Sequence, residues 1–327
     1  MSTTPPDVPA ATRHRLLLVA RDGALDSLLA GRRIAAHTGD LCLTRGPGPG
    51  ARPGDEPDGP RPDVALVCDD RDATARLLAL GVPVVHLRSG HDPGAAPADE
   101  APADEAPAGA LHRVHLPGWL PGPRPTGRDV RTTGTLAPTR LNRGRTRAGT
   151  LLLLSLWGVP EAEAAAFVDG PMVALAREAA RRTGHCDIVH DTAGALVRAA
   201  LGPDAAAAGT SGSITVHRAA EVDVDALHAR ADVCLASPTL AALTLAQARH
   251  APLTLLPPLG AAQRDLAERA RGAVSLPEAT DPADPELWAA PRDPAADPWR
   301  ELAAASDDLR GAQRVARTLR QLSFAPL

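Results

Sequence analysis

Short apolar runs alternate with amphipathic segments along the first half of the chain. The runs are RLLLVA at 15–20, LCL at 41–43, PDVALVCDD at 62–70 and GVPVVHLRSG at 81–90. Continuous apolar runs of this length, separated by helical periodicity, predict buried strands with covering helices. The pattern therefore predicts a parallel α/β sheet that opens with a βαβ unit.

The second half repeats this alternation at closer spacing. Buried strands are predicted at 150–158 (TLLLLSLWG) and 185–191 (HCDIVHD), and residues 214–270 contain three further strand and helix pairs. Asp191 is expected to cap the helix at 192–202, and Ser237 the helix that follows DVCLA. Residues 297–322 are predicted to form one long final helix, which in two-domain sheets often packs back across the domain junction.

The length of 327 residues is natural for two domains, each with its own core. We expect the following division: a disordered N-terminus at 1–12, a first Rossmann-like domain at 13–138 with a disordered insertion at 92–109, a linker at 139–149, a second Rossmann-like domain at 150–276, and a Pro-rich segment with the C-terminal helix at 277–327. The Arg-rich stretch 124–147 is either a solvated linker or an anion-facing hinge of the cleft.

Composition narrows the function classes. All 35 basic residues are Arg, which indicates codon bias of a GC-rich bacterial genome and excludes a Walker-type phosphate lysine. The net charge of −4 argues against non-specific nucleic-acid binding. The four cysteines lie in apolar runs without paired spacing, and we expect all of them to be reduced core residues of a cytoplasmic protein. No apolar run is long enough for a transmembrane segment.

The helix that begins at Ser237, Pro238 and Thr239 follows a buried strand directly. A helix N-terminus at the carboxyl end of a parallel strand is where α/β proteins hold phosphate. Four segments also resemble the peptidoglycan UDP-GlcNAc transferase group of the GT-B glycosyltransferases. These are GVPVVHLRSGHDPG, TTGTLAP, LLLLSLWG and the stretch 229–270, which follows the pattern "a.aDvvi.r.Ga.tl.Ea.a.g.P.i.iP.p.....Q..NA".

The resemblance implies a GT-B fold, in which two Rossmann-like domains face a cleft and a C-terminal helix crosses back. It also implies a metal-independent transferase that uses a nucleotide sugar, with UDP-sugar as co-substrate and no further cofactor. Within the resemblance, Ser237, Thr239, Ser155 and Gly158 would face the diphosphate. The base would lie near His217, Arg218 and Ala219, and Gln263 would contact the sugar.

A small or specialised-metabolite acceptor fits the short first domain, and cytosylglucuronate (CGA) synthases, which join cytosine to glucuronate, are soluble enzymes of this type. A homodimer or a partner glycosyltransferase is also expected. Leu245 stands where the resembled group has a ribose-binding Glu, and ARDGALDS replaces its loop GGtGGH. A catalytically silent binding partner and a UDP-sugar epimerase therefore stay open as alternatives.

The candidate general bases are Asp22, just after the first strand, and His91, on the loop after the strand at 81–90. Asp26 lies close behind Asp22, and a capping carboxylate is the plain alternative for Asp22. His86, inside its strand, is more typical of a core histidine than of a base. The acidic pair in DVD at 223–225 precedes a helix and is interpreted as cap and first-turn carboxylates, so we expect no metal site.

Overall fold

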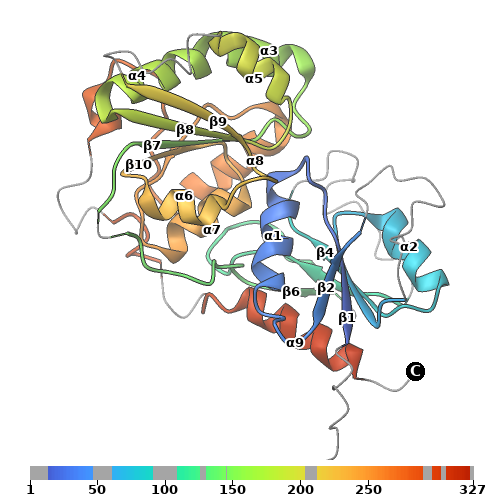
Figure 1. Ribbon diagram of the computed structural model, residues 1–327. Coiled ribbons are helices and arrows are strands. Elements are labelled where there is room, and N and C mark those ends of the chain that lie inside the picture. The colour runs from blue at the N-terminus through green and yellow to red at the C-terminus, as the bar shows by residue number, and fades with distance from the viewer. Residues whose placement is uncertain are drawn as a thin grey trace, which may run out of the picture.

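The computed structural model describes residues 14–46, 61–90, 109–125, 130–144, 146–202, 212–289, 297–302 and 307–324. Two parallel sheets form two domains, which are stacked one above the other in Figure 1. His91, residues 1–12 and the predicted insertion at 92–109, apart from Gly109, lie outside the described residues.

The first domain is built on a six-stranded sheet with strand order β2-β1-β3-β4-β5-β6, all pairs parallel. Its central strands are fully buried because their sequences are continuously apolar, as in VALVC of β3. The elements are β1 (Arg15–Val19), α1 (Leu25–Ala35), β2 (Cys42–Arg45), β3 (Val64–Cys68), α2 (Arg71–Ala79), β4 (Val84–Arg88), β5 (Leu111–Val114) and β6 (Val130–Thr132).

The second domain has a five-stranded parallel sheet with strand order β11-β10-β7-β8-β9. The first strand of this domain lies at the centre of its sheet, as in Rossmann-like folds. The elements are β7 (Thr150–Leu154), α3 (Glu161–Phe167), the π-helical turn η2 (Val168–Met172), α4 (Val173–Thr183), β8 (His185–His190), α5 (Gly194–Leu201), β9 (Ser213–Arg218), α6 (Val224–Arg230), β10 (Val233–Ala236), α7 (Leu240–Ala248), β11 (Thr254–Leu255), α8 (Gly260–Arg271) and the 3₁₀ helix η4 (Pro285–Trp288).

The C-terminal helix α9 (Gly311–Ser323) returns to the first domain and lies beneath α1 in Figure 1. Val315 and Leu319 belong to the same buried cluster as Leu16 and Leu66 of the first sheet. This confirms the predicted α/β GT-B class with a C-terminal helix that crosses back. The helix is shorter than the predicted 297–322, because residues 297–302 form turns and α9 begins only at Gly311.

Helix α1 joins the two domains. Its apolar residues Leu25, Leu28 and Leu29 share one buried cluster with Leu240 and Leu243 of α7. Figure 1 shows α1 standing beside α6 and α7 at the junction. The burial of this continuous apolar surface is the main force that holds the domains against each other.

A buried ion pair fixes the register of this contact. Arg33 of α1 is 2.8 Å from the carboxylate of Asp225, with side-chain exposures of 2% and 22%. The same guanidinium donates to the carbonyl of Leu136 and the hydroxyl of Thr244. Asp225 follows the predicted capping residue Asp223, whose carboxylate accepts from the amide of Ala226. The capping interpretation of Asp223 is therefore confirmed, and Asp225 has an additional role between domains.

Three local predictions are wrong. Cys42 is exposed on the edge strand β2, whereas Cys68, Cys186 and Cys234 are buried as expected. Asp191 does not cap α5, whose N-cap is Ala193 with φ 55° and no side-chain bond. Ser237 does not cap α7 either, because that helix begins at Leu240 and Thr239 accepts the capping bond from Ala242.

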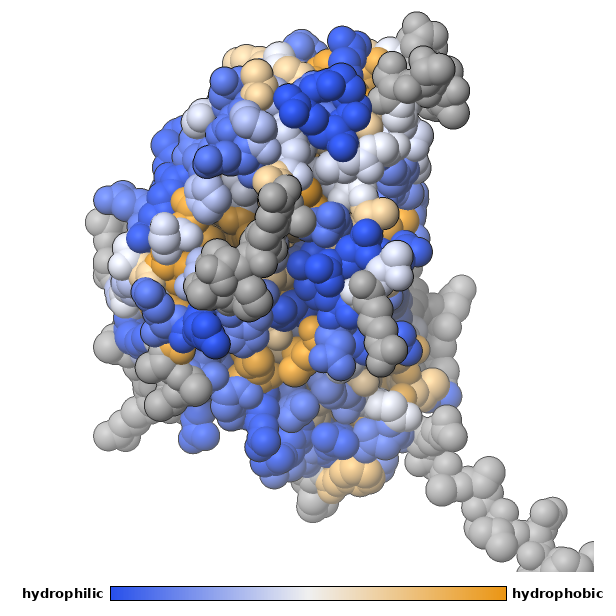
Figure 2. Space-filling model, turned by 90° about the vertical axis from the view of Figure 1, so that its left-hand side faces the viewer, coloured by the Kyte–Doolittle hydropathy of each residue, from blue (hydrophilic) through white to orange (hydrophobic). Residues whose placement is uncertain are grey.

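The surface is mostly hydrophilic on the face in Figure 2, with apolar residues gathered in patches around mid-height. Among the described residues, no helix is both long and apolar enough to cross a membrane.

Candidate functional site

A cavity of about 510 Å³ lies between the two domains. Its walls come from the loops that follow β1, β3, β4 and β5 in the first domain. In the second domain they come from the loop after β7, the N-terminal end of α7 and one side of α8. The carboxyl ends of parallel strands point into it from the first domain, which is the usual position of ligand sites in open α/β sheets.

Asp26 connects the two walls of this cavity. It lies in the first turn of α1, and its carboxylate accepts hydrogen bonds from the amides of Ala241 at 2.6 Å and Leu240 at 3.3 Å. These amides form the N-terminal end of α7, which is the helix end predicted to face a phosphate. In this structure the anion at that helix end is the carboxylate of Asp26.

Burial, with a smaller contribution from the nearby charge of Asp69, raises the pKa of Asp26 to about 7. The two amide hydrogen bonds and Arg33 act in the opposite direction and are outweighed. A carboxyl group with a pKa near neutrality can both take up and release a proton, which is the property required of a general acid or base. Asp26 is therefore the strongest candidate for proton transfer in the cavity.

Gly90, two residues after the end of β4, packs directly on Asp26. A Cβ atom added to Gly90 would lie 2.4 Å from the Oδ2 atom of Asp26 and 2.6 Å from its Cβ. Only a residue without a side chain allows this approach. The loop after β4 therefore helps to hold the carboxylate against α7.

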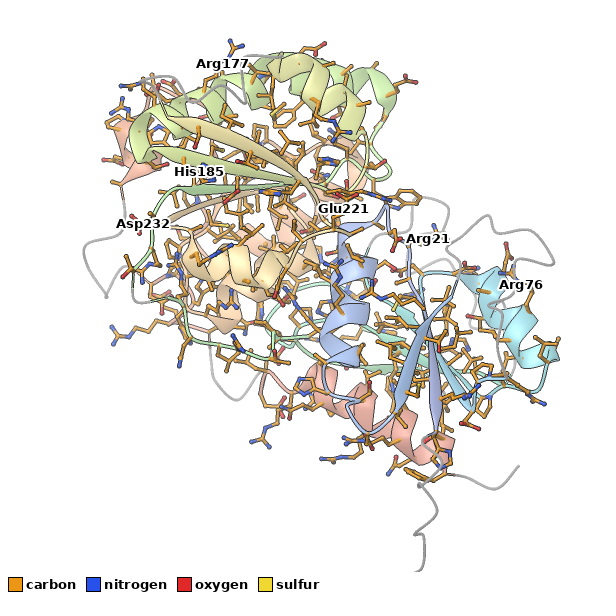
Figure 3. All side chains as sticks on the ribbon, in the orientation of Figure 1. Arg21, Arg76, Arg177, His185, Glu221 and Asp232 are labelled. Atoms are coloured by element: carbon orange, nitrogen blue, oxygen red, sulfur yellow. The ribbon has the colours of Figure 1, made fainter. Side chains whose placement is uncertain are left out.

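The cavity wall is rich in arginine. Arg21 lies 5.7 Å from the ring centre of Trp157, so this contact also spans the two domains. Figure 3 shows Arg21 at the domain junction, whereas Arg76 and Arg177 lie away from it. The charged side chains of the wall are five arginines and three aspartates: Arg21, Arg71, Arg88, Arg124, Arg269, Asp26, Asp69 and Asp265.

Two histidines line the first-domain wall. Burial lowers the pKa of His115 to about 4, so its imidazole is neutral at physiological pH. His86 is buried in β4, and its Nδ1 atom lies 3.2 Å from the Nδ1 atom of His112 on the paired strand β5. This position fits the core interpretation of His86, although its side chain also reaches the cavity.

Ser155, Ser237 and Gln263 form one buried network at the floor of the second domain. The amide of Ser155 donates to the hydroxyl of Ser237, and the side-chain amide of Gln263 donates to the carbonyl of Ser155. The hydroxyl of Ser155 donates to Asp191, whose carboxylate also accepts from the amide of Leu156. Ser155 and Gln263 line the cavity together with Thr239, while Ser237 and Gly158 do not.

The residues predicted near the base lie away from the cavity lining. His217 pairs with Asp187 at 2.7 Å on neighbouring strands of the second sheet. The carbonyl of Ala219 accepts a hydrogen bond from Arg32 of α1 at 2.8 Å, and the same guanidinium donates to the carbonyls of Ala220 and Val222. Arg218, predicted with them, is exposed at the end of β9. The side chain of Arg32, from the first domain, therefore occupies the carbonyl groups of residues 219, 220 and 222.

The two predicted general bases have different outcomes. Asp22 is exposed and does not line the cavity, and His91 lies outside the described residues. Sequence reasoning named Asp26 only as a neighbour of Asp22 and missed its contact with α7. The available signal was its place in the first turn of the helix after β1, since a side chain there faces the end of the sheet.

The position of the expected ribose-binding Glu holds a core residue. Leu245 is fully buried within α7. Gln247 is also buried, and its side-chain oxygen accepts from the hydroxyl of Thr135 at 2.9 Å. In the described part of the chain, no cluster of three or more His, Cys, Asp or Glu side chains could hold a metal ion.

Two stretches of the Arg-rich segment 124–147 are docked on protein. Arg143 donates to the carbonyls of Ala231 and Asp232, and Arg249 donates to the carbonyl of Arg140. Arg124, by contrast, lines the cavity and donates to the carbonyl of Gly118. The segment is therefore neither a solvated linker throughout nor an anion-facing hinge throughout.

The model of one protein family, described as CGA synthase-related protein, matches residues 16–327. No curated protein sequence matches the chain. Among solved structures, the glycosyltransferase of kitacinnamycin is 14% identical, with a TM-score of 0.48 and coverage of 93% of this chain and 98% of that one. The spinosyn rhamnosyltransferase SpnG is 16% identical, with a TM-score of 0.48 and coverage of 95% and 96%.

MurG of Acinetobacter baumannii is 11% identical, with a TM-score of 0.43 and coverage of 94% and 99%. These similarities concern the fold alone. The fold assignment rests on the strand orders of the two sheets and on the return of α9 to the first domain.

Proposed function

The chain belongs to the family of CGA synthase-related proteins, and from this premise we propose that it transfers a sugar from a nucleotide sugar to a small acceptor in the cleft between its domains. The observation that carries the proposal is Asp26, a carboxyl group with a pKa of about 7 held between the two walls of the cavity. A glycosyl transfer needs a base that removes a proton from the acceptor, and Asp26 is suited to this task.

The donor would be a UDP-sugar whose diphosphate lies against the N-terminal end of α7. In this structure the amides of Leu240 and Ala241 donate hydrogen bonds to Asp26. Donor binding would exchange the carboxylate for phosphate oxygens, because a doubly charged diphosphate gains more from the helix end. The exchange would release the carboxylate toward the acceptor at the moment when the donor is in place.

The arginines of the wall would then act on the leaving group. Arg21 and Arg124 reach the cavity from the first domain, and Arg269 reaches it from α8. Positive charge near a departing nucleoside diphosphate stabilises the negative charge that develops as the bond to the sugar breaks. Ser155 and Gln263 already hydrogen-bond to protein, so we assign them the role of shaping the donor side rather than binding the sugar directly.

A second candidate is a binding protein without catalysis. Asp26 caps α7, and Arg32 fills the carbonyls of Ala219, Ala220 and Val222. Both contacts put first-domain side chains at backbone groups that the family resemblance assigns to the nucleotide. A chain that keeps these contacts permanently could not place the nucleotide for a reaction and would act as a binding protein.

One experiment separates the two. The protein is incubated with UDP-glucuronate, UDP-glucose or UDP-GlcNAc, together with cytosine and other small acceptors, and released UDP is measured. Asp26→Asn is the test variant and Asp22→Asn is the matched control. Release of UDP that is lost only in Asp26→Asn supports the transferase. Thermal protection by UDP without release supports the binding protein, and no nucleotide effect contradicts both.

A further inference from the structure

A pair of arginines marks one wall of the cavity in the first domain. Arg88 is the last residue of β4, and Arg71 is the first residue of α2, which follows β3. The two strands pair in parallel with Cys68 opposite Leu87, so their carboxyl ends lie side by side. Both arginines line the cavity together with Asp69 and His86.

Asp69 lies on the same wall as these two arginines, and hydrogen bonds from Ser89 hold its carboxylate in place. Its φ of 57° lies in the left-handed region, where a residue with a side chain is strained. The amide of Ser89 donates to its Oδ1 atom at 2.8 Å, and the hydroxyl of Ser89 donates to its Oδ2 atom. Strained residues of this kind gather at functional sites because the surrounding structure holds one required geometry.

Arg88 is partly buried, and its guanidinium makes no hydrogen bond or ion pair with any described residue. Burial lowers the pKa of Arg88, the neighbouring charge of Arg71 lowers it further, and Asp69 opposes both. A partly desolvated guanidinium beside a second positive charge gains further when an anion binds to it. The planar fork of Arg matches the two oxygens of a carboxylate or phosphate.

We propose that the acceptor carries a carboxylate or a phosphate group, and that Arg88, with Arg71 beside it, binds this group on the first-domain wall of the cavity. The inference rests on the proposed transferase function, since it names the class of its acceptor. Arg88 lies at the carboxyl end of β4, beside Arg71 and Asp69, whereas the diphosphate is proposed to lie against the N-terminal end of α7, so we assign the anion at Arg88 to the acceptor. The anionic group would hold the acceptor while Asp26, on the same side of the cavity, takes its proton.

The test uses two variants with equal loss of charge. Arg88→Gln removes the guanidinium from the wall, and Arg76→Gln removes an exposed one from α2 that points away from the cleft (Figure 3). Binding of inorganic phosphate and of succinate is measured by calorimetry and by thermal shift, without any nucleotide. We expect binding by the native protein and Arg76→Gln, and at least a ten-fold weaker binding by Arg88→Gln. Arg88→Lys, which keeps the charge without the fork, is expected to bind with intermediate affinity and shows that the site still folds.

A second arm separates acceptor from donor. The affinities for UDP-glucuronate and for UDP-glucose are measured in the native protein and in Arg88→Gln. For each of the two nucleotide sugars, we expect the variant to bind as tightly as the native protein. A selective loss of UDP-glucuronate binding in Arg88→Gln would overturn the proposal, because the arginine would then bind the donor carboxylate. Equal binding of phosphate and succinate by native protein and Arg88→Gln would overturn it as well.

Released UDP is followed in parallel with neutral and anionic acceptors. Arg88-dependent anion binding together with no UDP release from any donor would contradict the transferase and leave the anion site standing. UDP release that needs no anionic acceptor and is unchanged in Arg88→Gln would contradict the anion site and leave the transferase standing.

Discussion

Replacing Asp26 by Asn should make the protein more stable and less active at alkaline pH. The Asn side chain keeps one oxygen that can accept the hydrogen bond from Ala241, now 2.6 Å from the carboxylate. It removes the charge that burial makes unfavourable. The same group would thus be unfavourable for folding and required for the reaction, as is common for residues at active sites.

The size of the effect follows from the pKa of Asp26, which rises from 3.8 to about 7. About three pKa units at 1.36 kcal/mol each correspond to about 4 kcal/mol between the charged and neutral forms. Asp26 is partly exposed, so solvent screening reduces this to about 3 kcal/mol. The amide group also loses the weak bond from Leu240, which contributes about 1 kcal/mol. The expected net gain is about 2 kcal/mol, or roughly 4 °C in melting temperature.

The sign depends on pH in a defined way. The folded-state pKa is raised, so the contribution of Asp26 to stability is complete below pH 4 and is lost as the pH rises to about 7. Asn does not titrate. The difference between variant and native protein should therefore grow between about pH 4 and pH 7 and level off above pH 7.

Urea unfolding at pH 5.5 and pH 8.5 measures this difference, with Asp22→Asn as an exposed control that should change neither stability nor activity. In the same preparations, UDP release by Asp26→Asn should fall by about 10²-fold to 10⁴-fold. A variant that is less stable than the native protein at pH 8.5 would refute the reasoning, because Asp26 would then be an ionised cap of α7. Unchanged UDP release would refute its role as base.

Three further substitutions test the geometry around the cleft. Gly90→Ala places a Cβ atom 2.4 Å from the Oδ2 atom of Asp26 and should reduce UDP release at least ten-fold. The control variant Gly39→Ala has open space around the new Cβ atom and should release UDP at the native rate. Arg33→Met leaves the carboxylate of Asp225 without its partner, and urea unfolding should show a free energy of unfolding lower by about 3 to 5 kcal/mol. Leu319→Ala creates a cavity where α9 meets the first sheet and should lower the free energy of unfolding by about 2 to 5 kcal/mol, while Arg317→Ala on the exposed side of α9 should change it by less than about 0.5 kcal/mol.

Apolar runs identified the strands because burial on both faces of a parallel sheet needs continuous apolar sequence. RLLLV, VALVC and TLLLL became β1, β3 and β7, and each is buried along its length apart from Arg15. The prediction that Cys42 is buried failed because an apolar run does not reveal whether its strand is central or at the edge of the sheet. The run LCL is apolar, yet β2 is the edge of its sheet, and strand order depends on contacts between distant segments.

Side-chain partners were harder to predict than elements. Asp191 and Ser237 both precede helices, and local rules therefore assigned them as caps. In the folded chain Asp191 bonds to Ser155, which is 36 positions away, and Ser237 bonds to the same residue across 82 positions. A polar group takes the partner that burial brings to it, and that partner is not visible from local sequence.

The sequence by itself determined the alternation of strands and helices, because apolar periodicity acts over a few residues. Its length indicated two domains, and analogy with other two-domain sheets indicated the return of a C-terminal helix. The tertiary structure decided which of the two acids after the first strand lines the cavity. Asp22 and Asp26 are only four positions apart in the sequence, but only Asp26 contacts α7, through a hydrogen bond that spans 215 residues of sequence. Packing of α1 between the domains sets that contact, and the same packing buries the carboxylate and raises its pKa to about 7.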